Sequence, residues 1–161
     1  DGQAILQSLV LAAIPDDAKR VMDLYSGHGT FALPLAQRGH TVEAYEGNET
    51  AIAAMKSAAK ASAGLELHAA VRDLATWPLT GAALKKTHAV VIDPPRAGAK
   101  AQTEALAQDG PATVVAVSCN PSTFARDARS LREGGYSLDW IAPLDQFLFT
   151  GHVELVARFY R

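Results

Sequence analysis

The chain has 161 residues, 48% of them hydrophobic, which is enough for one domain with a substantial core. Fifteen Lys and Arg against seventeen Asp and Glu give a formal net charge of -2, which excludes the strong positive charge of nonspecific nucleic-acid binders. A single cysteine excludes an internal disulfide, no Cys/His group has zinc-ligand spacing, and no apolar stretch approaches a membrane span, so we expect a cytoplasmic protein without metal or membrane contact.

Helix and strand patterns alternate along most of the chain. Apolar residues at helical spacing between Ile5 and Ala13 predict a first helix, which Pro15 ends. The expected strands are 20–25, 40–46, 65–70, 88–93, 112–121, 136–144 and 151–161. The expected helices between them are 30–39, 49–63 and 122–135, the last with Ser122 as its N-cap. This alternation predicts an α/β fold with about seven strands, mostly parallel and covered by helices on both faces.

The last two expected strands are too close in sequence for a helical crossover, so we expect them to pair antiparallel at one edge of the sheet. In open α/β sheets, ligands bind beyond the carboxyl ends of the strands. Four polar positions fall at that edge: residues 26–29, Glu46, Asp93 and Cys119.

A glycine-rich segment, DLYSGHGTFA, lies between the first strand and the next helix and contains a Gly-x-Gly-x-x-Ala pattern. Gly27 and Gly29 would let backbone amides approach a ligand, and Glu46, at the end of the next strand, could accept hydrogen bonds from ribose hydroxyls. Either a nicotinamide dinucleotide or S-adenosylmethionine satisfies this pattern. Asp23, four residues before Gly27, resembles the acidic residue in the acidic-x-x-x-Gly-x-Gly motif of class I methyltransferases. The antiparallel last strand resembles that of their seven-stranded sheet. Both features favour S-adenosylmethionine.

Each of these residues also has a purely structural interpretation. The two glycines could be ordinary turn residues, and Glu46 and Glu154 could be solvated acids on strands. Asp93 could begin a turn before two prolines, and the lone Cys119 at the end of an apolar strand could be core packing.

Four motifs, DLYSGHGTF, DPPRAG, SCNPSTFARD and DQFLFTGHVE, occur in this order between about Arg20 and Glu154. Together they resemble the RNA uracil-5-methyltransferase family, which makes 5-methyluridine in transfer or ribosomal RNA. The resemblance implies a Rossmann-like class I methyltransferase sheet with an antiparallel last strand, S-adenosylmethionine as cofactor and RNA as substrate. It also implies that residues 1–161 are a single methyltransferase domain, the C-terminal part of a longer protein.

The resemblance also implies a role for each motif residue. Cys119, in SCNP, stands at the position of the nucleophile, and Glu154, at the end of GHVE, at the position of the base. Tyr25, Thr30, Glu46 and Asp93 occupy positions that contact S-adenosylmethionine in the family. The predicted cofactor-binding residues are Asp23, Tyr25, Gly27, Gly29, Thr30, Glu46 and Asp93.

The sequence departs from the family pattern in a few places. Ser26 replaces a frequent Cys, Thr30 a frequent Asn and Leu148 a frequent Pro, and upstream RNA-recognition segments of the family are not in this chain. The sequence assigns no role to Arg96, Phe147 or His152, and it specifies neither the target uridine nor the oligomeric state.

Other functions fit parts of the pattern. The chain could be a module that binds S-adenosylmethionine but is inactive without RNA-binding domains. A nicotinamide-dependent oxidoreductase shares the glycine pattern, but the sequence has no Tyr-x-x-x-Lys pair. A small-molecule methyltransferase would leave SCNP and GHVE without a shared chemical purpose.

Overall fold

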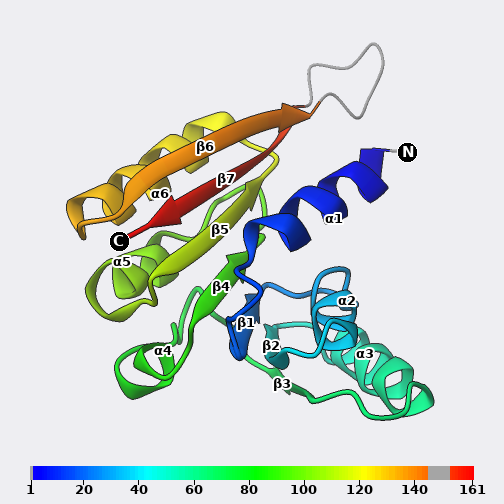
Figure 1. The fold of residues 1–161 in the computed structure, drawn as a ribbon. Coiled ribbons are helices and arrows are strands. Elements are labelled where there is room, and N and C mark those ends of the chain that lie inside the picture. Colours follow the sequence, from blue (N-terminus) through cyan, green and yellow to red (C-terminus); the bar gives the residue numbers. More distant parts are fainter. Residues whose placement is uncertain (1, 145–152) are drawn as a thin grey trace.

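The structure is a computed structural model that describes residues 2–144 and 153–161. In this part of the chain one seven-stranded sheet has the order β3-β2-β1-β4-β5-β7-β6 (Figure 1). The strands are β1 (Arg20–Leu24), β2 (Thr41–Glu46), β3 (Leu67–Val71), β4 (Ala89–Ile92), β5 (Thr113–Ser118), β6 (Ser137–Leu144) and β7 (Glu154–Tyr160). The described helices are α1 (Gly2–Ala13), α2 (Ala32–Gln37), α3 (Glu49–Ala61), α4 (Ala82–Lys85), α5 (Lys100–Asp109) and α6 (Pro121–Glu133).

Strands β1 to β5 pair parallel to one another, whereas β7 pairs antiparallel with both β5 and β6. Every residue of β4 and β5 is buried, as expected for central strands with helices on both faces. This arrangement confirms the predicted α/β class, including the mostly parallel sheet and the antiparallel last strand.

Two apolar cores lie on opposite faces of the sheet because neighbouring side chains of a strand point to opposite faces. Val115 packs in the core that contains residues of α1, α2 and α3, whereas Val114 packs in the core with α4, α5 and α6. Figure 1 shows these two groups of helices on either side of the sheet. The central strands are therefore fixed from both faces, and their carboxyl ends form one firm edge.

Two short helices, α4 and α5, were not expected from the sequence. The inward face of α5 includes the polar residues Gln102 and Thr103, which hide its apolar period. The buried Gln102 side chain accepts a hydrogen bond from the Leu79 amide at 2.8 Å and donates one to the Leu79 carbonyl at 3.0 Å. A buried amide is tolerated here because both of its polar ends are paired.

The predicted N-cap of α6 was wrong by two residues. Asn120 has extended backbone angles, and its side-chain oxygen accepts a hydrogen bond from the Ser122 amide at 3.0 Å. Pro121 occupies the first helical position, where its fixed φ favours the helix and its missing N–H costs nothing. The helix therefore begins immediately after the SCN segment.

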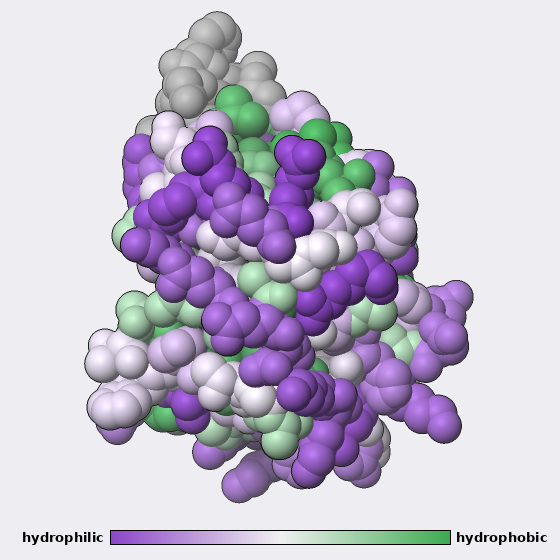
Figure 2. Space-filling view, turned by 90° about the vertical axis from the view of Figure 1, so that its left-hand side faces the viewer, coloured by the Kyte–Doolittle hydropathy of each residue, from purple (hydrophilic) through white to green (hydrophobic). Residues whose placement is uncertain are grey.

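The surface seen from the left-hand side of Figure 1 is mostly hydrophilic, with apolar residues gathered in its upper part (Figure 2). None of the helices in the described ranges is long and apolar enough to cross a membrane.

The packing of α6 on β7 can be tested with Phe159, which is fully buried and lies 6.3 Å, between ring centroids, from Phe124 of α6. Phe159→Ala should lower the free energy of unfolding by about 3–5 kcal/mol, because it leaves a cavity in the core. The neighbouring Tyr160 is 48% exposed, so Tyr160→Ala should cost roughly 0.5 kcal/mol or less. Urea denaturation of both variants measures the difference, and equal losses would contradict this packing.

Candidate active site

The glycine loop after β1 has a backbone that requires its glycines. Gly27 and Gly29 have φ angles of 53° and 93°, and Tyr25 also has a positive φ of 61°. A Cβ on Gly29 would lie 2.9 Å from the Met55 side chain, so the loop packs closely against α3. A Cβ on Gly27 would meet nothing within 4 Å, so a ligand could approach the backbone there.

Glu46, the last residue of β2, holds this loop through its carboxylate. One oxygen accepts a hydrogen bond from the Gly27 amide at 3.0 Å, and the other accepts one from the Asn48 amide at 3.0 Å. Each carboxylate oxygen has a further lone pair. Glu46 can therefore brace the loop and still accept hydrogen bonds from ribose hydroxyls.

Asp23 lies fully buried beneath the same loop. Neither of its carboxylate oxygens has a hydrogen-bond partner of ordinary geometry among the described residues. Burial, and next the negative charge of Asp93, raise the pKa of Asp23 well above its usual range, although the Ala32 amide partly opposes this. A buried, unsatisfied carboxyl group next to a glycine loop is a feature that a bound cationic or hydrogen-bonding ligand would explain.

Thr30 and Tyr25 lie at the two ends of the loop. The Thr30 carbonyl accepts a hydrogen bond from the Gln7 side chain at 2.7 Å, which ties α1 to the loop. Tyr25 is half-buried, and burial, followed by the charge of Asp127, raises its pKa to about 12. Tyr25 also lines a hollow of about 490 Å³ together with Ala75 and residues 97–101. The hollow adjoins the loop on its β4 side.

Cys119 and Glu154 lie at the same edge of the sheet because β5 pairs with β7. The antiparallel register pairs Ser118, the last residue of β5, with Leu155, and Cys119 and Glu154 are the next residues beyond this pair. Cys119 is half-buried and forms no disulfide. One carboxylate oxygen of Glu154 is buried without a hydrogen-bond partner in the described part of the chain. The sheet therefore brings a thiol and an unsatisfied carboxylate to one edge from positions 35 residues apart.

Asp93 is a further acidic group at this edge. Its amide donates to the Leu24 carbonyl at 3.1 Å, which fixes it beside the end of β1. Burial, and then the negative charge of Glu154, raise the pKa of Asp93 to about 7. The carboxyl groups of Asp23, Asp93 and Glu154 thus form one electrostatically coupled group between the glycine loop and Cys119.

A polar clamp, made by α6 on residues 96–99, holds the loop after Asp93. The Asn120 and Thr123 side chains both donate to the Arg96 carbonyl at 3.0 Å. The buried Asp127 accepts a hydrogen bond from the Ala99 amide at 2.7 Å and forms an ion pair with Arg126 at 2.8 Å. The clamp therefore joins the DPPRAG loop to the helix that follows Cys119.

The structure brings all of the predicted site residues to one edge of the sheet, but sequence reasoning missed the residues that position them. Asp127, Gly98 and Gln7 contact the site loops without having been predicted. Asp127 stands between basic residues in an amphipathic helix, which is also typical of a solvated acid. Phe147 and His152 lie outside the described residues. The described residues contain no group of three or more His, Cys, Asp or Glu that could hold a metal ion.

The clamp can be tested at Gly98, whose φ is 76°. A Cβ there would lie 2.4 Å from the Arg126 guanidinium and 2.7 Å from the Asp127 carboxylate. Gly98→Ala should destabilise the fold by at least roughly 1 kcal/mol more than Gly135→Ala, because overpacking adds to backbone strain. Gly135 is a matched control, since it has a φ of 93° but open space around its Cβ position. Equal destabilisation in thermal or urea unfolding would contradict the clamp.

The raised pKa of Asp93 predicts a pH dependence of stability. Between about pH 4 and about pH 7 the folded chain keeps a proton on Asp93 that the unfolded chain has lost. The free energy of unfolding should therefore fall as the pH rises through this window. Asp93→Asn should match the unchanged chain near pH 4 but be more stable at pH 8, by up to roughly 4 kcal/mol.

Urea titrations at several pH values measure this difference. Some pH dependence should remain in the variant because the pKa of Asp23 is also raised. Asp17→Asn, at an exposed position in the turn after α1, is the control. A variant that follows the pH profile of the unchanged chain would show that Asp93 is not buried as described.

Comparison with known proteins gives a consistent picture. A family model described as tRNA (Uracil-5-)-methyltransferase matches residues 5–158. An uncharacterized RNA methyltransferase of Caulobacter vibrioides is 48% identical over 145 residues, which cover 89% of this chain and 35% of that protein. A 23S rRNA (uracil(1939)-C(5))-methyltransferase of Alteromonas naphthalenivorans is 39% identical over 91% of this chain and 31% of its own length.

Among solved structures, the tRNA (uracil-54, C5)-methyltransferase of Pyrococcus abyssi, in complex with S-adenosyl-L-homocysteine, has a TM-score of 0.84 and 34% identity. The match covers 98% of this chain and 38% of the archaeal chain. The chain thus spans about a third of the length of the proteins it matches. The family resemblance of its four motifs is confirmed: the chain belongs to the tRNA (uracil-5-)-methyltransferase family.

Proposed function

We propose that this chain transfers a methyl group from S-adenosylmethionine to carbon 5 of a uridine in RNA, with Cys119 as nucleophile and Glu154 as base. The observation that carries the proposal is the β5–β7 register: Cys119 and Glu154 each lie one residue beyond its last pair, Ser118–Leu155, and one Glu154 carboxylate oxygen is buried and unpaired among the described residues. Both groups lie at the edge of the sheet that also holds the glycine loop. A nucleophile, a base and a cofactor loop therefore converge on one place.

The residues around the loop fit S-adenosylmethionine. Glu46 would accept the ribose hydroxyls, and the open backbone at Gly27 would lie against the cofactor. Asp23, fully buried and without a hydrogen bond of ordinary geometry in the described residues, would gain one from the cationic, hydrogen-bonding amino acid end of the cofactor. Tyr25 would border the hollow beside residues 97–101, which has room for a flat ring. When bound, S-adenosylmethionine supplies an electrophilic methyl group on a sulfonium sulfur.

Cys119 solves the first chemical problem of the reaction. Carbon 5 of uracil is too weak a nucleophile to accept a methyl group unaided. Addition of the Cys119 thiolate to carbon 6 forms a carbon–sulfur bond and moves the double-bond electrons into an enolate. Carbon 5 of the enolate then takes the methyl group. A thiolate suits this task because it is both a strong nucleophile and a good leaving group.

Glu154 solves the second problem, which is to release the product. After transfer, carbon 5 bears both the new methyl group and its original hydrogen. A carboxylate oxygen of Glu154 takes that proton, the electrons re-form the carbon 5–carbon 6 double bond, and the bond to Cys119 breaks. The acceptor oxygen of Glu154 has no hydrogen bond to lose among the described residues, which keeps it ready for the proton.

Asp93 would lie at the boundary between cofactor and uracil. It follows β4, beside the end of β1, and it interacts electrostatically with Glu154 and Asp23. A pKa of about 7 leaves Asp93 partly protonated near neutral pH, so that it can donate a hydrogen bond as well as accept one. We assign it, with Thr30, to the cofactor side of the site.

The substrate is proposed as RNA at the level of class. Two of the relatives named above are described as acting on transfer RNA and on 23S ribosomal RNA, and both kinds of uridine are candidates for this chain. A uridine in a duplex would have to leave its base stack to reach Cys119. A single-stranded or loop uridine avoids most of that cost.

The two catalytic roles can be separated by the covalent RNA adduct. Glu154→Gln should accumulate an adduct that already carries the methyl group, because elimination lacks its base, whereas Cys119→Ala should form no adduct. Product formation should fall by a factor of at least roughly 100 in both variants. Denaturing gels of reactions with bulk RNA, followed by mass spectrometry of the cross-linked peptide, measure this.

Two controls accompany this experiment. Glu133→Gln changes an exposed glutamate at the end of α6 and should leave turnover and adduct unchanged. S-adenosylmethionine affinity, measured by calorimetry, should stay the same in Cys119→Ala. Retained turnover in Cys119→Ala would remove the thiol from the mechanism, and loss of every adduct in Glu154→Gln would count against Glu154 as the base.

A further inference from the structure

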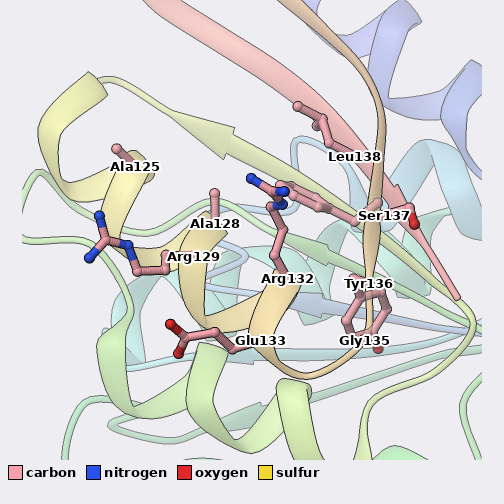
Figure 3. A pocket seen from close by; sticks show the side chains of 10 residues that line it. Ala125, Ala128, Arg129, Arg132, Glu133, Gly135, Tyr136, Ser137 and Leu138 are labelled. Carbon is pink, nitrogen blue, oxygen red and sulfur yellow. The ribbon is translucent and has the colours of Figure 1, made fainter.

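A groove of about 970 Å³ lies between α6 and the edge strand β6 (Figure 3), and none of the residues that line it belongs to the glycine loop. Ala125, Ala128, Arg129 and Arg132 line it from α6, and Leu138 lines it from β6. The small side chains of the two alanines leave a gap between helix and strand. Leu138 stays 44% exposed as a result.

The α6 wall of the groove is cationic. Arg129 and Arg132 are both exposed, and neither guanidinium group has a hydrogen bond or an ion pair in the described part of the chain. Arg126, on another side of the same helix, is instead paired with Asp127 in the clamp. Among the residues that line the groove, the acidic one is the exposed Glu133, the last residue of α6. Two guanidinium groups are therefore available to an anionic partner.

The α6 wall of the groove starts at Ala125, on the helix that follows the proposed nucleophile, and runs toward the opposite edge of the sheet. Helix α6 starts at Pro121, two residues after Cys119, and α-helices rise 1.5 Å per residue. Arg129 and Arg132 thus lie about 12 Å and about 17 Å along the helix from its first residue. A polymer with one unit held at Cys119 could reach both arginines with the next few units.

We propose that this groove binds the phosphates of the RNA strand that flanks the target uridine. This inference rests on the proposed function, and it adds the path that the RNA strand takes across the protein surface. Arginine is well suited to this role, since its planar guanidinium donates paired hydrogen bonds to phosphate oxygens. Because the chain has a net charge of -2, its own attraction for RNA would come from a local cationic surface of this kind.

An acidic protein segment could satisfy the same two charges. RNA is favoured because the cationic wall belongs to the helix that starts beside Cys119. Phosphate contacts of this type position a strand without reading its sequence. The groove would therefore contribute to the affinity for RNA and fix the orientation of the strand, whereas the Cys119 site would select uridine.

The test compares two double variants of the full 161-residue chain. One is Arg129→Gln with Arg132→Gln. The control is Lys56→Gln with Lys60→Gln, which removes the same charge from exposed positions on α3, a helix of equal length that lines another surface hollow. The probe is a fluorescein-labelled single-stranded oligouridylate, long enough to reach from Cys119 to Arg132. Fluorescence anisotropy at several salt concentrations gives the Kd and its salt dependence.

The groove variant should bind the oligouridylate roughly tenfold more weakly, and the slope of log Kd against log salt should fall by about 1.4, or 0.7 for each lost phosphate contact. The control should keep both values close to those of the unchanged chain. Equal weakening in both variants would overturn the proposal, because net charge alone would then explain binding. Unchanged RNA affinity in the groove variant would also overturn it, as would a lack of RNA binding by the unchanged chain.

Assays of 5-methyluridine formation by the unchanged chain separate this inference from the proposed function. Methylation together with unaltered RNA binding by the groove variant would reject the groove and keep the function. Groove-dependent RNA binding without methylation would keep the groove and reject the function. If the substitutions at Arg129 and Arg132 weaken the binding of a labelled acidic peptide but not that of RNA, the groove belongs to a protein partner and the RNA proposal is overturned.

Discussion

The insertion of β7 antiparallel between β5 and β6 is the constraint on which the site depends. The hydrogen-bond register leaves no freedom in which residues face each other, since a slip of one residue would turn every side chain of β7 to the other face of the sheet. With Phe159 buried in one core and Val156 in the other, that slip is prohibited. The same packing that stabilises the domain therefore fixes Leu155 opposite Ser118, with Cys119 and Glu154 as the next residues at the edge of the sheet.

Stability and chemistry compete at this edge. Several carboxyl groups lie close enough there to influence one another, and burial raises the pKa of both Asp23 and Asp93. The protein holds them in place with well-paired neighbours: Glu46 is bonded to two backbone amides, and Asp127 joins the loop after Asp93 to α6. The unsatisfied groups thus sit on a rigid frame, as expected when a site is organised for a ligand that the fold alone does not need.

The general fold could be predicted because the central strands are uniformly apolar and the helices between them keep their period. The prediction failed at α5, where polar Gln102 and Thr103 face the core. It also failed at the N-cap of α6, because the helix begins at Pro121, directly after Asn120. The candidate site residues could be found from motifs at strand ends. Their mutual position could not, because the β5–β7 register that brings Cys119 and Glu154 to one edge is a long-range pairing that no local pattern contains. The clamp by Asp127 was missed for the same reason.

The central claim is that Cys119 activates carbon 5 of uridine for methyl transfer. Its most direct test is the release of tritium to water from RNA labelled at carbon 5 of uridine, measured with and without S-adenosylmethionine. The account predicts release from the unchanged chain that needs S-adenosylmethionine and disappears in Cys119→Ala. Methyl transfer to RNA without tritium release, or release that persists in Cys119→Ala, would contradict it.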